Sequence, residues 1–96
     1  MDRKNAKAFC MLGNVLTDLG EFEKSDQEFN IAHKLEPSNP DIMLNWGIAL
    51  SKQKKYLKAK EKFEASMKFP VMNLHSLYFL GLIEVEMKNH SYNPGF

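Results

Sequence analysis

The chain has 96 residues, of which 44% are hydrophobic and 26% charged, as expected for one soluble globular domain with a modest core. Its 13 basic and 12 acidic residues give a formal net charge of +1, which argues against a dedicated nucleic-acid or membrane-surface protein. The single cysteine, Cys10, cannot form an internal disulfide, and neither a membrane span nor a signal peptide is visible. We therefore expect a cytoplasmic protein without a membrane partner.

Apolar residues recur every three to four positions, which predicts helices over about 5–19, 22–35, 40–53, 56–69 and 73–88. Gly20 follows the first helix, where a glycine in a left-handed conformation can end it. Pro37 ends the second helix and Pro70 the fourth, because proline cannot continue the hydrogen-bond ladder. Asn39-Pro40-Asp41 begins the third helix with an N-cap, a proline in the first turn and an acidic residue. There is no sustained alternation that would predict strands.

The chain also repeats itself at an offset of 34 residues, which is the sign of a helical-repeat architecture. Three glycines align, and a large apolar residue precedes each of them. The aligned sets include Asn5, Asn39 and Asn73; Leu12, Trp46 and Leu80; Gly13, Gly47 and Gly81; Leu16 and Leu50; Phe22 and Tyr56; and Phe29 and Phe63. Gly13 and Gly47 should let paired helices approach closely, with Phe29 and Phe63 filling the space between them.

This pattern resembles the tetratricopeptide repeat (TPR), written W-x2-L-G-x2-Y, then A-x3-F, then P. The matching residues are Phe9, Leu12, Gly13, Leu16, Ser25, Phe29 and Pro37 in the first unit, Met43, Trp46, Gly47, Leu50, Ala59, Phe63 and Pro70 in the second, and Leu77, Leu80 and Gly81 in the third. The resemblance implies an all-α fold, an α-solenoid of antiparallel helix-turn-helix hairpins. It comprises repeat 1 (about 5–38), repeat 2 (about 39–72), the first helix of a third repeat (about 73–89) and a tail (90–96).

The third unit departs from the pattern, because Glu84 replaces an apolar residue and no partner helix follows. The last helix is apolar nearly all round, so part of it, chiefly Leu77 and Leu80, should face a missing neighbour. Three explanations remain open: the chain is part of a longer array, it pairs with a copy of itself through residues 74–85, or the tail folds back and places Tyr92 or Phe96 there. We expect self-association.

The first helices of TPR-type units line a concave groove, and helical spacing selects the side chains that packing leaves free for a partner. These are Lys7, Cys10, Asn14, Thr17, Asp41, Leu44, Asn45, Ile48, Ser51, His75, Tyr78, Phe79 and Leu82. One group of TPR proteins binds acidic chaperone tails with a clamp of asparagines and basic residues. Asn14 and Asn45 match the clamp asparagines, but Cys10, His75 and Phe79 occupy the basic positions. A partner with apolar anchors is therefore expected.

No signature of catalysis, a cofactor or a metal site stands out. The histidines (His33, His75 and His90) are scattered, no glycine-rich phosphate loop is present, and a Cys10–His75 pair would lack an orienting third residue. The glycosylation sequon at residues 89–91 matters only in a secreted protein.

Acidic residues at 21–28 and lysines at 52–62 are read as solvated faces of opposite sign on neighbouring hairpins, with an acidic partner of the lysines as the alternative. The sequence predicts a non-enzymatic module that binds a peptide or partner helix in the groove. The alternative is a structural unit that oligomerises through its last helix.

Overall fold

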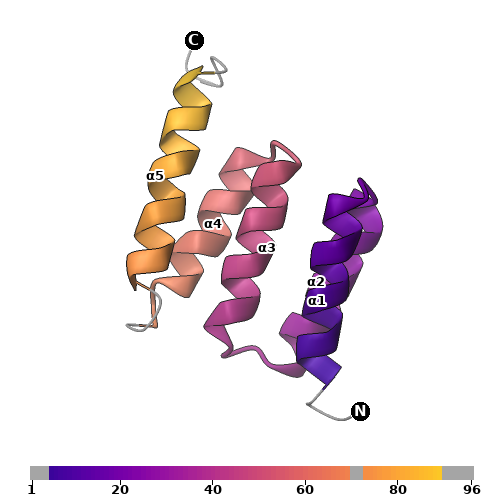
Figure 1. Ribbon diagram of the computed structural model, residues 1–96. Coiled ribbons are helices and arrows are strands. Elements are labelled where there is room, and N and C mark those ends of the chain that lie inside the picture. Colours follow the sequence, from indigo (N-terminus) through magenta and orange to yellow (C-terminus); the bar gives the residue numbers. More distant parts are fainter. Residues whose placement is uncertain (1–4, 70–72, 90–96) are drawn as a thin grey trace.

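The computed structural model describes residues 5–69 and 73–89, and all regular structure in these ranges is α-helical (Figure 1). The helices are α1 (Asn5–Asp18), α2 (Phe22–Leu35), α3 (Pro40–Lys52), α4 (Tyr56–Ser66) and α5 (Asn73–Asn89). The predicted all-α class is thus confirmed for these residues, and four of the helices match their predicted bounds to within one residue. The tail at 90–96, with the predicted roles of Tyr92 and Phe96, lies outside the described residues.

Helix α4 is shorter than predicted and ends at Ser66 instead of residue 69. The Ser66 hydroxyl donates to the Phe63 carbonyl oxygen at 2.7 Å, and the amides of Lys68 and Phe69 bond to carbonyls three residues back. Such tight bonds mark the last turn of a helix. Phe69 also precedes Pro70, a position that disfavours helical backbone.

The helices lie side by side, with α1 and α2 at one end of the molecule and α5 at the other (Figure 1). Consecutive helices pack in pairs, α1 with α2 and α3 with α4, and α5 packs on α4. Helix α3 also contacts α1, α2 and, to a smaller extent, α5. The molecule is elongated, with extents of 46 × 31 × 18 Å.

In each helix pair, one glycine permits the two helices to approach closely. A Cβ atom on Gly13 would lie 2.7 Å from the Phe29 ring, and one on Gly47 would lie 2.6 Å from the Phe63 ring. Both rings are fully buried, so each aromatic side chain sits directly on the backbone of the opposite helix. This is the packing role that the 34-residue repeat predicts for these four residues.

Trp46 joins the two pairs. Its ring stacks on Phe29 with centroids 6.1 Å apart, and its Nε1 donates to Asp26 Oδ1 at 3.1 Å. Lys62 covers the outer face of the indole, with Nζ 4.0 Å from the ring centroid, a cation–π contact. Lys55 Nζ lies 3.7 Å from Asp26 Oδ2. Asp26 of α2 therefore connects to α3 and to Lys55, the residue that precedes α4, in line with the opposite charges predicted for these faces.

Candidate functional site

A pocket of about 290 Å³ opens between α1 and α3. It is lined by Lys7, Cys10, Met11, Asn14, Asn39, Asp41, Ile42 and Asn45. Five of these residues belong to the set predicted to line the groove: Lys7, Cys10 and Asn14 from α1, and Asp41 and Asn45 from α3. The pocket therefore combines side chains that lie 34 residues apart in the two repeats.

Helix geometry explains why these side chains meet. Lys7, Cys10 and Asn14 are spaced three and four residues apart, so they share one face of α1. On α3, Asn45 Nδ2 donates to the Asp41 carbonyl oxygen at 2.8 Å, four residues earlier. That bond occupies a donor of the carboxamide and leaves its Oδ1 as an acceptor for a ligand.

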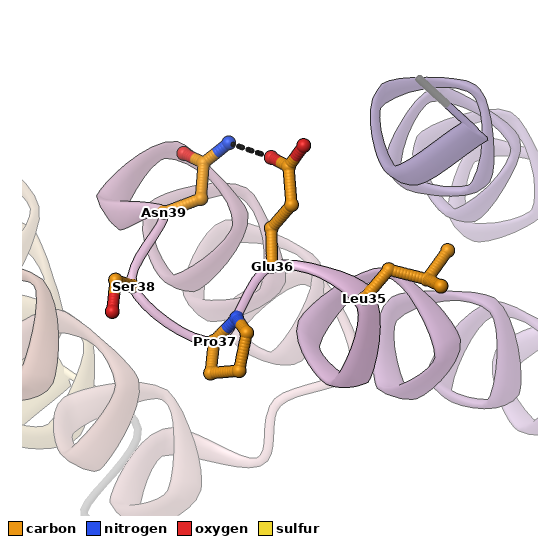
Figure 2. Close-up of a pocket in the computed structure, with 5 residues that line it drawn as sticks. All are labelled: Leu35, Glu36, Pro37, Ser38 and Asn39. Carbon is orange, nitrogen blue, oxygen red and sulfur yellow. Dashed lines mark hydrogen bonds between the residues drawn. The ribbon is translucent and has the colours of Figure 1, made fainter. Parts of the chain in front are cut away.

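Asn39, in the loop before α3, also lines the pocket. Asn39 Oδ1 accepts from the Asp41 backbone N–H at 2.9 Å, which confirms the predicted N-cap. Asn39 Nδ2 donates to Glu36 Oε1 at 2.9 Å, so the carboxamide is held from both ends. A second hollow, of about 330 Å³, lies beside this loop and is lined by Leu35–Asn39. Figure 2 shows these five residues and the hydrogen bond between Asn39 and Glu36. Since one short segment lines this hollow, the hollow brings no distant groups together.

The Cys10 thiol forms part of the pocket floor and is 6% exposed. Burial raises the pKa of this thiol to about 11, and the Asp41 carboxylate adds to the rise, although a hydrogen bond from Asn45 opposes it. The group is therefore a neutral thiol near pH 7 and lacks the thiolate character of a nucleophile. It acts here as a small apolar side chain.

Four other predicted residues do not line this pocket. The structure places Thr17 elsewhere than expected: it is buried, its Oγ1 donates to the Gly13 carbonyl oxygen at 2.9 Å, and it lies 2.5 Å from Ser25 Oγ. The hydrogen bond with Ser25 joins Thr17 to α2, and the side chain is therefore absent from the surface. Leu44 is buried in the core with Phe63 and Ile83, and Ile48 packs against that cluster. Ser51 is half-buried, and its hydroxyl donates to the Ile48 carbonyl oxygen at 2.7 Å.

The predicted residues on α5 form a separate group. Tyr78 and Leu82 are 64% and 43% exposed, and His75 is also exposed. Phe79 is half-buried and stacks on Phe63, with centroids 5.5 Å apart. The Tyr78 ring meets the edge of Phe79 at 5.2 Å. None of these side chains lines the pocket between α1 and α3, so the residues predicted for the groove fall into a polar set on α1 and α3 and a largely aromatic set on α5.

The two leucines expected to face a missing neighbour behave differently. Leu77 is 53% exposed, as expected. Leu80 is half-buried and packs against the second core cluster, because it lies on the side of α5 that turns towards α4. Leu77, and not Leu80, therefore belongs to the uncovered surface.

Sequence reasoning missed three residues that line the pocket: Met11, Asn39 and Ile42. Met11 lies four residues after Lys7, so the helical spacing that selected Lys7 also pointed to it. Asn39 was assigned only to capping, although a cap side chain at the start of α3 also borders the face that α3 presents to α1.

In the described ranges, no three His, Cys, Asp or Glu side chains are grouped so that they could hold a metal ion. The helices in these ranges include none that is long and apolar enough to cross a membrane. Comparisons of the chain with protein-family models, with curated proteins and with solved structures found no match.

Proposed function

We propose that this chain is a protein-interaction module, a stack of TPR-type hairpins that binds a peptide or partner helix in a groove along α1, α3 and α5. The observation that carries the proposal is the pocket between α1 and α3. It gathers five side chains predicted for the groove, from two successive units, and all of them except Cys10 lie outside the buried core clusters. Gly13 and Phe29, by contrast, are committed to the interior.

The chemistry of the pocket favours a main-chain ligand. The Asn14 side chain is half-buried and makes no hydrogen bond within the described part of the chain, so its carboxamide can both donate and accept. Asn45 adds an acceptor. An extended peptide presents alternating N–H and C=O groups, and two carboxamides in one pocket can bind both kinds.

Charge and burial narrow the class of peptide. The pocket holds one cation, Lys7, and one anion, Asp41, so it has no excess of positive charge for an acidic tail. Cys10 and Ile42 give it an apolar floor. The ligand is therefore a segment of low net charge whose small apolar side chain reaches that floor, while bulkier apolar anchors contact Tyr78 and Leu82 on α5.

A peptide selection on the immobilised full-length chain tests this proposal. Selected peptides are titrated by calorimetry into the wild-type protein and into the double variant Asn14→Ala/Asn45→Ala. Loss of two hydrogen bonds should weaken binding roughly 10- to 30-fold, since each contributes about 1 kcal/mol. Asn30→Ala, an exposed asparagine on α2, is the matched control and should bind like the wild type. Peptides that bind the double variant as tightly as the wild type would refute the groove as the binding site.

A further inference from the structure

Helix α5 carries an uncovered apolar stripe along its length. Its members, spaced four, three and four residues apart, are Leu74, Tyr78, Gly81 and Val85. Leu74 is 81% exposed, Tyr78 64% and Val85 52%, and Gly81 is exposed as well. Alternating spacings of three and four residues place side chains along one seam, as in helices that pair as coiled coils.

The glycine of this seam differs from its two counterparts. The Phe29 ring covers Gly13 and the Phe63 ring covers Gly47, whereas a Cβ atom on Gly81 would meet nothing within 4 Å. Gly81 therefore leaves the same gap on its helix surface as Gly13 and Gly47 do, but no aromatic ring among the described residues occupies it. Tyr78 offers an exposed aromatic ring one turn away on the same seam.

We infer that α5 pairs with α5 of a second copy in an antiparallel arrangement, with Tyr78 of each copy seated on Gly81 of the other. An antiparallel pair is centred on a two-fold axis. An axis midway between Tyr78 and Gly81 that sets these two residues opposite each other also sets Leu74 opposite Val85. One register therefore matches every member of the seam, and it repeats twice the aromatic-on-glycine contact already present inside the molecule.

The charges beside the seam allow this pairing. Between Leu74 and Val85 the seam contains no charged residue. Glu84, the acidic residue at its flank, is already paired with Lys60, with Oε1 and Nζ 3.4 Å apart. Two copies of α5 can therefore approach without bringing uncompensated carboxylates together.

The area available makes the pair a weak one. The seam and its flanking side chains, Leu77 and Leu82, offer roughly 500 Å² per copy, less than the about 800 Å² of a standard interface. We expect a dissociation constant on the order of ten micromolar. The pairing and the proposed groove share Tyr78 and Leu82, so a bound peptide would compete with the pair for these two side chains. Leu74, Gly81 and Val85 belong to the pair alone, because they lie outside both the pocket between α1 and α3 and the set predicted for the groove.

The opposite end of the molecule is the competing surface. Helix α1 exposes Leu12 and Val15 at 44% and 53%, and Leu19, directly after the helix, is 70% exposed. Contact between α5 of one copy and α1 of the next would be head-to-tail and would build open chains of copies. That face of α1 has no glycine site to receive Tyr78, since Gly13 is buried under Phe29. The α5–α5 pair is therefore favoured.

Two matched valines test the interface. Val85 and Val15 are 52% and 53% exposed at opposite ends of the molecule, so glutamate at either is expected to leave the fold intact, which circular dichroism checks. In sedimentation velocity up to high micromolar concentration, the wild type should form a dimer. Val85→Glu should raise the dissociation constant roughly 100-fold, and Val15→Glu should leave it unchanged. A wild type that stays monomeric, or a dimer that Val15→Glu also dissociates, would overturn the inference.

Cysteine cross-linking tests the register independently of those variants. Copies carrying Leu74→Cys should form an intermolecular disulfide when mixed with copies carrying Val85→Cys, and each variant alone should cross-link at least about ten times more slowly. The native Cys10 is buried and does not compete. Equal cross-linking in the mixture and in the separate solutions would show that α5 does not pair in this register.

Discussion

Replacing Gly47 with alanine should destabilise the protein, even though alanine is the better helix former. The new Cβ would lie 2.6 Å from Cε1 and 2.7 Å from Cδ1 of Phe63. The ring is 0% exposed, so it cannot swing into solvent to make room. Overpacking of this kind costs about 1–3 kcal/mol, whereas the helix propensity of alanine returns about 1 kcal/mol. A net loss of up to about 2 kcal/mol in the free energy of unfolding follows.

Gly81→Ala is the matched control, because a Cβ there meets nothing within 4 Å and only the propensity gain remains. This variant should be more stable than the wild type by about 0.5–1 kcal/mol. Gly13→Ala should behave like Gly47→Ala, since its Cβ would lie 2.7 Å from Phe29 Cε2. Urea unfolding followed by circular dichroism at low micromolar concentration measures all three. If Gly47→Ala and Gly81→Ala shift the midpoint equally and in the same direction, the proposed packing role of the glycines is wrong.

Three further predictions concern single side chains. Lys54 has a φ of 63°, the left-handed conformation that Gly20 adopts in the preceding turn, so Lys54→Gly should stabilise the fold by about 1 kcal/mol in thermal unfolding. At a pH of about 8, native Cys10 should react with a disulfide reagent about 100-fold more slowly than the denatured chain, because its pKa rises from 9.0 to about 11; equal rates would contradict its burial. Burial and the nearby Lys62 lower the pKa of His33. The folded state therefore disfavours the protonated ring, so the free energy of unfolding should fall as the pH drops below about 6.5. The fall should be smaller in His33→Gln. Identical dependence of stability on pH in the wild type and this variant would refute the prediction.

The repeat made most of the fold predictable. An offset of 34 residues aligned Gly13 with Gly47 and Phe29 with Phe63. In the structure, Gly13 contacts Phe29 and Gly47 contacts Phe63 in two equivalent arrangements. Leu12 was less predictable, because its counterpart Trp46 is covered by neighbouring helices while Leu12 is 44% exposed at the end of the molecule. A repeat pattern gives the environment of an internal unit and does not show where the stack ends.

The candidate site was predictable only in part. Helical spacing assigned Lys7, Asn14 and Asn45 to one predicted groove, and the structure places all three at one pocket, since that depends only on the geometry of two helices. It failed for Thr17, whose burial depends on hydrogen bonds with Ser25 on another helix and with a backbone carbonyl. No spacing along α1 reveals which polar side chain has such a partner across the pair.

Nuclear magnetic resonance of the asparagine side chains tests the central claim, that the α1–α3 face binds a peptide, most directly. In a titration with a selected peptide, the carboxamide signals of Asn14 and Asn45 should shift together and saturate, while those of Asn30 on α2 stay in place. Saturable shifts at Asn30, with none at the two pocket asparagines, would place the peptide on another surface and contradict the claim.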